Sequence, residues 1–322
     1  MLSVMSAATH PPSRPRVLLD CDPGHDDAIA IVVAARNTDL VGITTVAGNA
    51  PLTSTTHNAL VMRDLLGIDV EVHSGSSRPL VGKPKHAGHV HGESGLDGAD
   101  LPEPTTPLNG TDAAQFIVDA CHQHDKLWLV PVGPLTNIAL AMQKDPAVAQ
   151  RIAGISLMGG GSFGNRSAMG EFNIWADPEA AQIVFSSGAP IIMAGLDVTH
   201  QFQATPARIE RLRAIGGTLA ISLADLLVFF SMMYQRNHDE GHLQGGAMHD
   251  PLAVLALTHP ALFERTNRHV VVETKGEYTR GMTVIDERRL IERKASNVAV
   301  LTYVDAEAAF DLVTAAVAHF TP

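Results

Sequence analysis

The 322-residue chain has only two cysteines, Cys21 and Cys121, and no long hydrophobic run. Two thiols are too few for a disulfide framework or a thiolate metal site, and they suit a reducing cytoplasm. The longest apolar stretches, 29–35 and 226–234, fall far short of the roughly 20 residues that a membrane-spanning helix needs. We therefore expect a soluble, cytoplasmic protein with no membrane partner.

The sequence also has little positive charge. Its 23 Lys and Arg stand against 34 Asp and Glu, which gives a formal net charge of −11, and no basic run stands out. Binding to a nucleic-acid backbone or an anionic membrane requires a concentrated positive patch. No nucleic-acid partner is therefore expected, and small-molecule chemistry is favoured.

The apolar residues lie in short alternating segments. The chain is 45% hydrophobic, with 27 Gly and 19 Pro for connections. Runs rich in Val, Ile and Leu alternate with helical stretches from Val17 to Thr199, a pattern typical of parallel strands joined by helices. The predicted fold is α/β, with an open, mainly parallel Rossmann-like sheet flanked by helices. We assign residues 1–15 to a disordered N-terminal tail and residues 16–322 to a single domain.

Four aspartates, Asp20, Asp22, Asp26 and Asp27, lie where the first predicted strand ends and a helix begins. Ligands of open α/β sheets bind at this end of the strands. Carboxylates this close repel one another unless a cation or shared protons neutralise them, and a hard divalent metal is the natural solution. The alternative, helix capping by Asp26 and Asp27, leaves Asp20 and Asp22 unexplained.

Other candidates carry weaker signals. Asp250 precedes a predicted helix and is either a metal ligand or an N-cap. The segment Glu171-Phe-Asn173 precedes a helix capped by Asp177, which is also ordinary for a surface loop. Phe230 and Tyr234, one helical turn apart, fit core packing as well as the wall of a binding site.

Together these motifs resemble the inosine-uridine-preferring nucleoside hydrolase family, calcium enzymes that cleave the N-glycosidic bond of ribonucleosides. The most specific motif is Asp20-Cys-Asp-Pro-Gly-His-Asp-Asp27, with His25 in a variable position. The resemblance covers nearly the whole chain after the tail and implies the family's catalytic domain, which releases ribose and a free nucleobase. Supporting motifs follow in the family's order: Val46-Ala-Gly-Asn49, His91-Gly-Glu-Ser-Gly95, Gly133-Pro-Leu-Thr-Asn137, Met158-Gly-Gly-Gly161, Glu171-Phe-Asn173 with Asp177-Pro-Glu-Ala-Ala181, Gly195-Leu-Asp-Val-Thr199, and His249-Asp-Pro251.

The resemblance implies Ca²⁺ as the cofactor. Its ligands would be the carboxylates of Asp22, Asp27 and Asp250 and the main-chain carbonyl of Val132, completed by water and two ribose hydroxyls. Asp22 would also be the base that takes a proton from the attacking water, with Asn49 helping to orient that water.

The resemblance also implies a set of substrate contacts. Asp26 and Asn173 would bind the ribose hydroxyls near the metal, and ribonucleosides should therefore be preferred over 2′-deoxyribonucleosides. The 5′-hydroxyl would contact Asn165 and Glu171. The remaining implied contacts are Met158 beneath the sugar, His249 as the acid for the leaving base, and His91, Phe230 and Tyr234 around the base.

Several questions stay open at the level of sequence. The base preference is undetermined, and His238 and His242, in a stretch longer than in familiar relatives, fit surface positions better than catalytic ones. The family usually forms homodimers or homotetramers, so a homo-oligomer is expected. One alternative function is a magnesium phosphohydrolase of the haloacid dehalogenase type, although Pro23 and Gly24 stand where its hydroxyl residue is needed. Another is a catalytically silent nucleoside-binding protein of the same fold.

Overall fold

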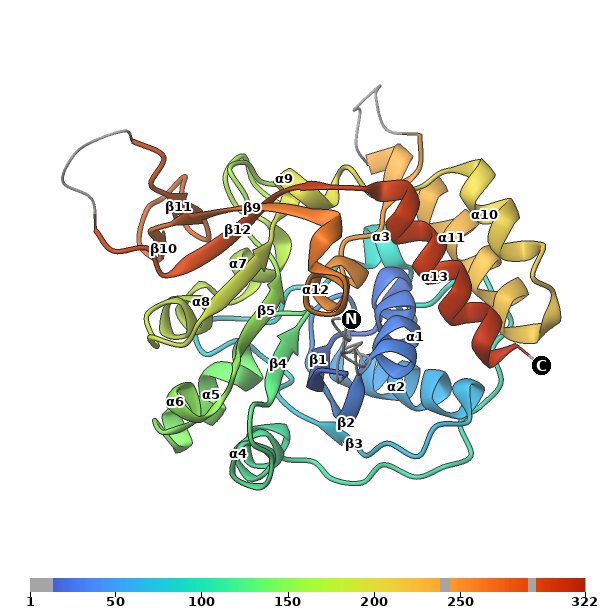
Figure 1. Ribbon diagram of the computed structural model, residues 1–322, viewed down its shortest axis with the longest axis horizontal. Helices are drawn as coiled ribbons and strands as arrows, with labels where there is room; N and C mark the ends of the chain where they lie inside the picture. Colours follow the sequence, from blue (N-terminus) through green and yellow to red (C-terminus); the bar gives the residue numbers. More distant parts are fainter. Residues whose placement is uncertain (1–13, 238–243, 289–293, 322) are drawn as a thin grey trace, which may run out of the picture.

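The computed structural model describes residues 14–237, 244–288 and 294–321. Its centre is an eight-stranded sheet in the order β3-β2-β1-β4-β5-β6-β12-β9 (Figure 1). All neighbours pair in parallel except β12 and β9, which are antiparallel at one edge. The predicted open, mainly parallel sheet is confirmed. The strands are β1 (Arg16–Cys21), β2 (Asp39–Thr45), β3 (Val72–Ser74), β4 (Trp128–Pro131), β5 (Gly154–Met158), β6 (Ile191–Ala194), β9 (Phe263–Arg268) and β12 (Val298–Val304).

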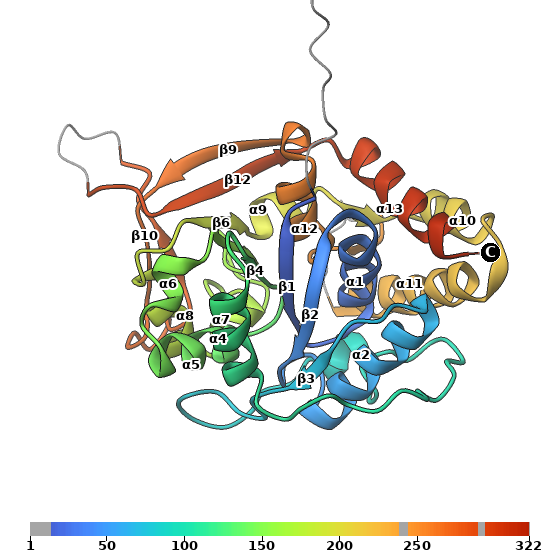
Figure 2. The ribbon, with the colours of Figure 1, turned by 60° about the horizontal axis from the view of Figure 1, so that its bottom comes forward.

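Helices cover both faces of this sheet (Figures 1 and 2). One layer contains α1 (His25–Asn37), α2 (Leu52–Leu66), α11 (Gly217–Asn237), α12 (Pro251–Thr258) and α13 (Ala306–Phe320). The opposite layer contains α4 (Ala113–Gln123), α5 (Thr136–Lys144), α6 (Val148–Arg151) and α8 (Pro178–Phe185).

The two layers enclose separate apolar clusters, because successive side chains of a strand point to opposite faces. In β1, Val17 and Leu19 join the cluster beneath α1, whereas Leu18 joins the cluster beneath α5. Strands buried on both faces are apolar throughout, which is why their positions can be predicted from composition.

The sequence did not predict the shortest elements. The helices α3 (Gly88–His91), α7 (Phe172–Ala176) and α9 (Leu196–Thr199) have four or five residues, too few to show a helical period. The edge strand β9 contains Glu264, Arg265 and Arg268, and charged side chains are common on unpaired edges. Two further short elements agree with the sequence pattern, which favours a helix over 206–215 and a β segment over 269–273: α10 (Pro206–Arg213) and β10 (Val270–Val272). The remaining short elements are η1 (Pro260–Leu262), the small ribbon of β7 (Gln203–Ala204) with β8 (Gly246–Ala247), and β11 (Thr283–Ile285), which pairs with β10.

Helix α11 is long and apolar enough, by length and composition alone, to cross a membrane. This helix does not stand out as an uninterrupted apolar run in the sequence, because polar residues such as Asp225 interrupt it. Half of the helix is buried, and it packs against α1, α10 and α13. Its Leu223 and Leu227 belong to the core, as in an interior helix of a water-soluble fold.

Candidate active site

The candidate site lies where the carboxyl ends of the central parallel strands meet the first turns of α1 and α12. Asp22 follows β1, Val132 follows β4, and Met158 ends β5. Helix α1 starts at His25 and so carries Asp26 and Asp27 in its first turn. This placement agrees with the general location of ligand sites in open α/β sheets.

Three buried carboxylates converge at this place. Asp26, Asp27 and Asp250 each offer an oxygen, and the three oxygens lie within 4.8 Å of one another. Asp250 occupies the N-cap position of α12, yet its side chain makes no capping hydrogen bond. The capping interpretation of Asp250 is therefore wrong, and its side chain belongs to the acidic cluster.

Asp22 lies next to this cluster, joined to it by Asn49. The Asn49 main-chain N–H donates to Asp22 Oδ2 (2.6 Å), and Asn49 Nδ2 donates to Asp27 Oδ2 (2.9 Å). The Asp22 main-chain N–H donates to Asp27 Oδ1 (3.1 Å). Asp22 Oδ1 is buried and has no hydrogen-bond partner within the described chain. A buried carboxylate oxygen in this state is available to a ligand from outside the chain.

Asp20 has a different environment from the other aspartates of its motif. Its Oδ1 accepts hydrogen bonds from Thr44 Oγ1 (2.7 Å) and Asn137 Nδ2 (2.8 Å). Burial raises the pKa of Asp20 to about 7. These hydrogen bonds connect β1 to β2 and α5, so Asp20 stabilises the packing of these elements next to the site.

Burial raises the pKa of every carboxyl group in the cluster. The pKa of Asp26 rises to about 7, with the nearby Asp27 adding to the effect, and the pKa values of Asp22 and Asp250 rise well above their ordinary range. No Lys or Arg of the described residues forms an ion pair with any of these groups. An all-oxygen donor set with uncompensated negative charge fits a hard divalent cation such as Ca²⁺ or Mg²⁺.

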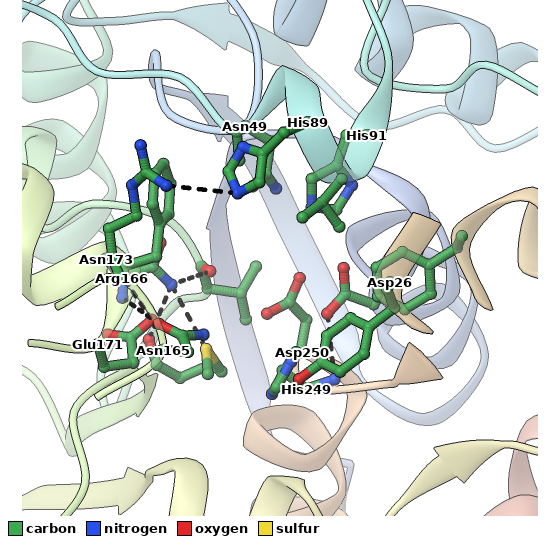
Figure 3. A pocket seen from close by; sticks show the side chains of 17 residues that line it. Asp26, Asn49, His89, His91, Asn165, Arg166, Glu171, Asn173, His249 and Asp250 are labelled. Carbon is green, nitrogen blue, oxygen red and sulfur yellow. Dashed lines mark hydrogen bonds between the residues drawn. The ribbon is translucent and has the colours of Figure 1, made fainter. Parts of the chain in front are cut away.

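A pocket opens above the cluster (Figure 3). Asp22 and Asp27 do not line it; they lie behind the wall formed in part by Asp26 and Asp250. The lining residues are Asp26, Asn49, Ala87, His89, Val90, His91, Val132, Met158, Asn165, Arg166, Glu171, Phe172, Asn173, Phe230, Tyr234, His249 and Asp250.

One wall of the pocket is built by the loop before α7 and the start of that helix. Asn173 Nδ2 donates to the main-chain oxygen of Val132 (2.8 Å), the predicted metal-ligating carbonyl. The Glu171 carboxylate accepts from three main-chain N–H groups, those of Gly160, Asn173 and Ile174. Burial raises the pKa of Glu171 to about 7. Glu171 therefore also holds the turn that starts α7.

The opposite wall is aromatic. Phe230 and Tyr234 are both buried, their ring centroids lie 5.6 Å apart, and both line the pocket. The pair is therefore packed in the core and also lines the pocket. His249 donates its main-chain N–H to Asp26 Oδ2 (3.0 Å), and its Nδ1 lies 2.7 Å from Thr199 Oγ1.

Every residue predicted to bind substrate lines this pocket. The residues His238 and His242 lie outside the described part of the chain. The lining residues His89 and Arg166 were not predicted from the sequence, although each lies within two positions of a predicted site residue. No role was predicted for His25 either, whose fully buried ring contacts His91.

The family model described as inosine-uridine preferring nucleoside hydrolase matches residues 17–311. The chain belongs to this family, as its motifs indicated, and not to the phosphohydrolases of the alternative interpretation.

Individual relatives cover almost the whole chain. The pyrimidine-specific ribonucleoside hydrolase RihA of Enterobacter sp. (strain 638) is 43% identical over 95% of this chain and 98% of its own. RihA of Escherichia coli (strain SMS-3-5 / SECEC) is 45% identical over 92% of this chain and 96% of its own. Among solved structures, a purine-preferring ribonucleoside hydrolase from Gardnerella vaginalis superposes with a TM-score of 0.88 at 34% identity, covering 95% of this chain and 98% of that one.

The raised pKa values predict that the metal-free protein loses stability as pH rises. Asp20 and Glu171, at about 7, bind protons more tightly when folded, so their stabilising contribution is complete below the unfolded values and is lost as pH rises through about 7. Burial lowers the pKa of His25 and His91, so these two groups make the stability rise with pH. Their effect ends near 6.5, the ordinary pKa of histidine in the unfolded chain.

The decisive window is therefore from about pH 6.5 to 8. The melting temperature of chelator-treated protein should fall across it, and added calcium should remove the part of the fall that comes from the clustered Asp26, Asp27 and Asp250, whose pKa values burial also raises. A melting temperature of the metal-free protein that rises steadily through this window would contradict the predicted loss of stability.

Proposed function

We propose that this protein hydrolyses the N-glycosidic bond of ribonucleosides, with a preference for pyrimidine bases, in a calcium-dependent reaction. The observation that carries the proposal is the buried group of Asp26, Asp27 and Asp250, of which Asp26 and Asp250 line the pocket and Asp27 lies behind them. The resemblance of the chain to ribonucleoside hydrolases over almost its full length supports the reaction class.

The metal site would use oxygens from distant parts of the chain. Asp22, Asp27, Asp250 and the main-chain oxygen of Val132 would hold the ion, which when bound supplies positive charge that acidifies a neighbouring water. The unpartnered Asp22 Oδ1 and the absence of a described Lys or Arg counter-charge support this donor set. Calcium is favoured over transition metals because all these donors are hard oxygens.

Asp22 would take the proton from the attacking water. Its raised pKa in the metal-free protein shows a carboxylate that binds a proton readily, and a neighbouring cation brings such a group back towards the ionised form. Asn49 contacts both Asp22 and Asp27 and also lines the pocket, so its amide is placed to orient the water.

The ribose would sit between the acidic floor and the wall at α7. Asp26 and Asn173 would bind the two ribose hydroxyls near the metal, with Asn165 and Glu171 at the 5′-hydroxyl and Met158 beneath the ring. All five residues line the same pocket. The acidic surroundings favour the positive charge that develops on the sugar as the bond to the base breaks.

The base would leave along the aromatic wall. Phe230 and Tyr234 offer flat apolar surface, and His249 would donate a proton to the departing base. The pyrimidine preference is proposed from the RihA relatives, which are more similar in sequence than the purine-preferring structural neighbour.

The direct test measures ribose release with a reducing-sugar assay on uridine, cytidine, inosine, guanosine and 2′-deoxyuridine. Uridine and cytidine should have the highest kcat/KM. We expect 2′-deoxyuridine to lose about 10⁴-fold, because the groups that bind the missing hydroxyl stay buried and unpaired. Chelation should abolish turnover, and calcium should restore it.

A chain that binds uridine but releases no ribose would instead be a silent binding protein of the same fold. Turnover that persists after complete chelation would show that the reaction does not need a metal ion.

Asp22→Asn tests the base directly. Loss of the general base should lower kcat by about 10²–10⁴-fold. The matched control is Asp20→Asn, which changes a buried carboxyl group of the same motif that contacts Thr44 and Asn137 rather than the acidic cluster, and it should keep kcat near that of the wild type. Circular dichroism verifies the fold of both variants. If Asp22→Asn retains wild-type kcat, the base is another group.

A further inference from the structure

Two cationic side chains contact the ring of Trp175 at one side of the active-site pocket. Lys85 Nζ lies 3.5 Å from the ring centroid, and the guanidinium carbon of Arg166 lies 5.3 Å from it. Lys85 also donates to the main-chain oxygen of Trp175 (3.0 Å). Arg166 lines the pocket, whereas Lys85 and Trp175 do not. The indole ring therefore holds the Arg166 guanidinium at the edge of the pocket.

The loop that carries Arg166 is closed by main-chain hydrogen bonds. The N–H groups of Arg166 and Ser167 both donate to the main-chain oxygen of Gly170 (3.0 and 3.2 Å). Asn165, the preceding residue, accepts a hydrogen bond at Oδ1 from the main-chain N–H of Phe172 (3.0 Å). These bonds fix the place where the Arg166 side chain leaves the backbone, next to a residue predicted to bind the sugar.

Neither cation is neutralised by a carboxylate. Among the described residues, Arg166 and Lys85 form no ion pair. The Arg166 guanidinium makes one long hydrogen bond, from Nη1 to His89 Nε2 (3.5 Å; Figure 3). Glu179, the carboxylate that attracts Lys85 most, is already bound by both Nη atoms of Arg280 (2.7 and 2.8 Å). Most N–H donors of Arg166 are therefore available to a ligand.

Arg166 lies at the end of the pocket proposed for the 5′-oxygen of the sugar. Asn165 and Glu171, proposed for the 5′-hydroxyl, lie on the same side of the pocket as Arg166, across from Asp26 and His249 (Figure 3). The Glu171 carboxylate already accepts from three main-chain N–H groups, which offset its negative charge. A substituent on the 5′-oxygen would thus extend towards a guanidinium.

The chemistry of the guanidinium favours an anionic substituent. This group is planar and always charged, and its paired N–H donors match the oxygens of a phosphate group. A neutral 5′-hydroxyl needs few hydrogen bonds, which Asn165 and Glu171 can supply. An unpaired arginine in the wall of the pocket is therefore explained better by a phosphate than by a hydroxyl group.

We propose that Arg166 forms a subsite for a phosphate group on the 5′-oxygen, so that the protein also hydrolyses pyrimidine ribonucleoside 5′-monophosphates. The proposal rests on the proposed function, since it uses the same sugar site and the same bond cleavage. The oxygen of water bonds to C1′, and the bond from C1′ to the base nitrogen breaks with its electron pair on the nitrogen. One water proton stays on the new hydroxyl group, and the other balances the proton that the nitrogen takes up. The products are ribose 5-phosphate and the free base.

Arg166→Met tests the subsite, because it keeps a flexible unbranched side chain and removes the charge. The matched control is Lys85→Met, which removes the same charge from the same indole ring but changes a side chain that does not line the pocket. The first readout is the affinity of the calcium-loaded protein for ribose 5-phosphate, measured by isothermal titration calorimetry. This measurement needs no turnover.

The wild type should bind ribose 5-phosphate. Arg166→Met should weaken this binding by about 10-fold or more, because a charged hydrogen-bond donor is lost. Lys85→Met should change it by less than about 3-fold, since a charge without direct contact is screened. A wild type that does not bind, an unchanged affinity in Arg166→Met, or equal losses in the two variants would overturn the proposal. The wild-type titration decides the first point even if a variant does not fold.

The second readout compares the release of uracil from uridine 5′-monophosphate and from uridine, while a parallel assay for inorganic phosphate verifies that the ester stays intact. The wild-type kcat/KM for the monophosphate should equal or exceed that for uridine. The ratio of the two values should fall by about 10-fold or more in Arg166→Met and should be retained in Lys85→Met.

A wild type that hydrolyses uridine but not the monophosphate would overturn the proposal. Failure of the proposed function looks different, since the wild type would then release uracil from neither substrate. Binding of ribose 5-phosphate would still decide whether the phosphate subsite exists.

Discussion

Repulsion among buried carboxylates is the constraint on which the rest of this structure depends. Asp22, Asp26, Asp27 and Asp250 share one end of the sheet, almost fully buried, and no described Lys or Arg compensates them. Without a cation such groups take up protons, as their raised pKa values indicate. A divalent ion bound beside them would return them to the ionised form. The feature that makes the metal-free protein sensitive to pH is thus the feature that would bind the ion.

The fold brings these groups together from opposite ends of the chain. Asp22 and Asp27 flank the first β–α turn, while Asp250 opens α12, which packs against α1. The parallel sheet fixes the direction of every strand, so the polar residues after β1, β2 and β4 face one another with no need for local sequence contact. Gly24 then allows His91 and Asn49 to approach the start of α1 closely, since a Cβ at this position would lie 2.5 Å from His91 Nδ1 and 2.9 Å from Asn49 Nδ2.

Much of this was predictable from sequence, for identifiable reasons. Apolar strands buried on both faces are local signals, and the sheet they predict is confirmed. The aspartate-rich turn after β1 is also a local signal, and the structure brings its Asp26 and Asp27 together with Asp250. The features that could not be predicted from the sequence depend on tertiary contacts. Capping and cluster membership are indistinguishable at Asp250 until the side chain is placed. The separation of Asp22 and Asp27 from the pocket surface, and the contact of His25 with a residue 66 positions away, follow from packing that no local pattern encodes.

Diffraction from crystals grown with calcium, recorded at a wavelength that gives anomalous signal from the ion, tests the central claim most directly. The account predicts one strong anomalous peak among the oxygens of Asp22, Asp27 and Asp250, within about 2.3–2.6 Å of its ligands, and near the main-chain oxygen of Val132. A site that stays free of anomalous density at saturating calcium, with its carboxylates still clustered, would contradict it.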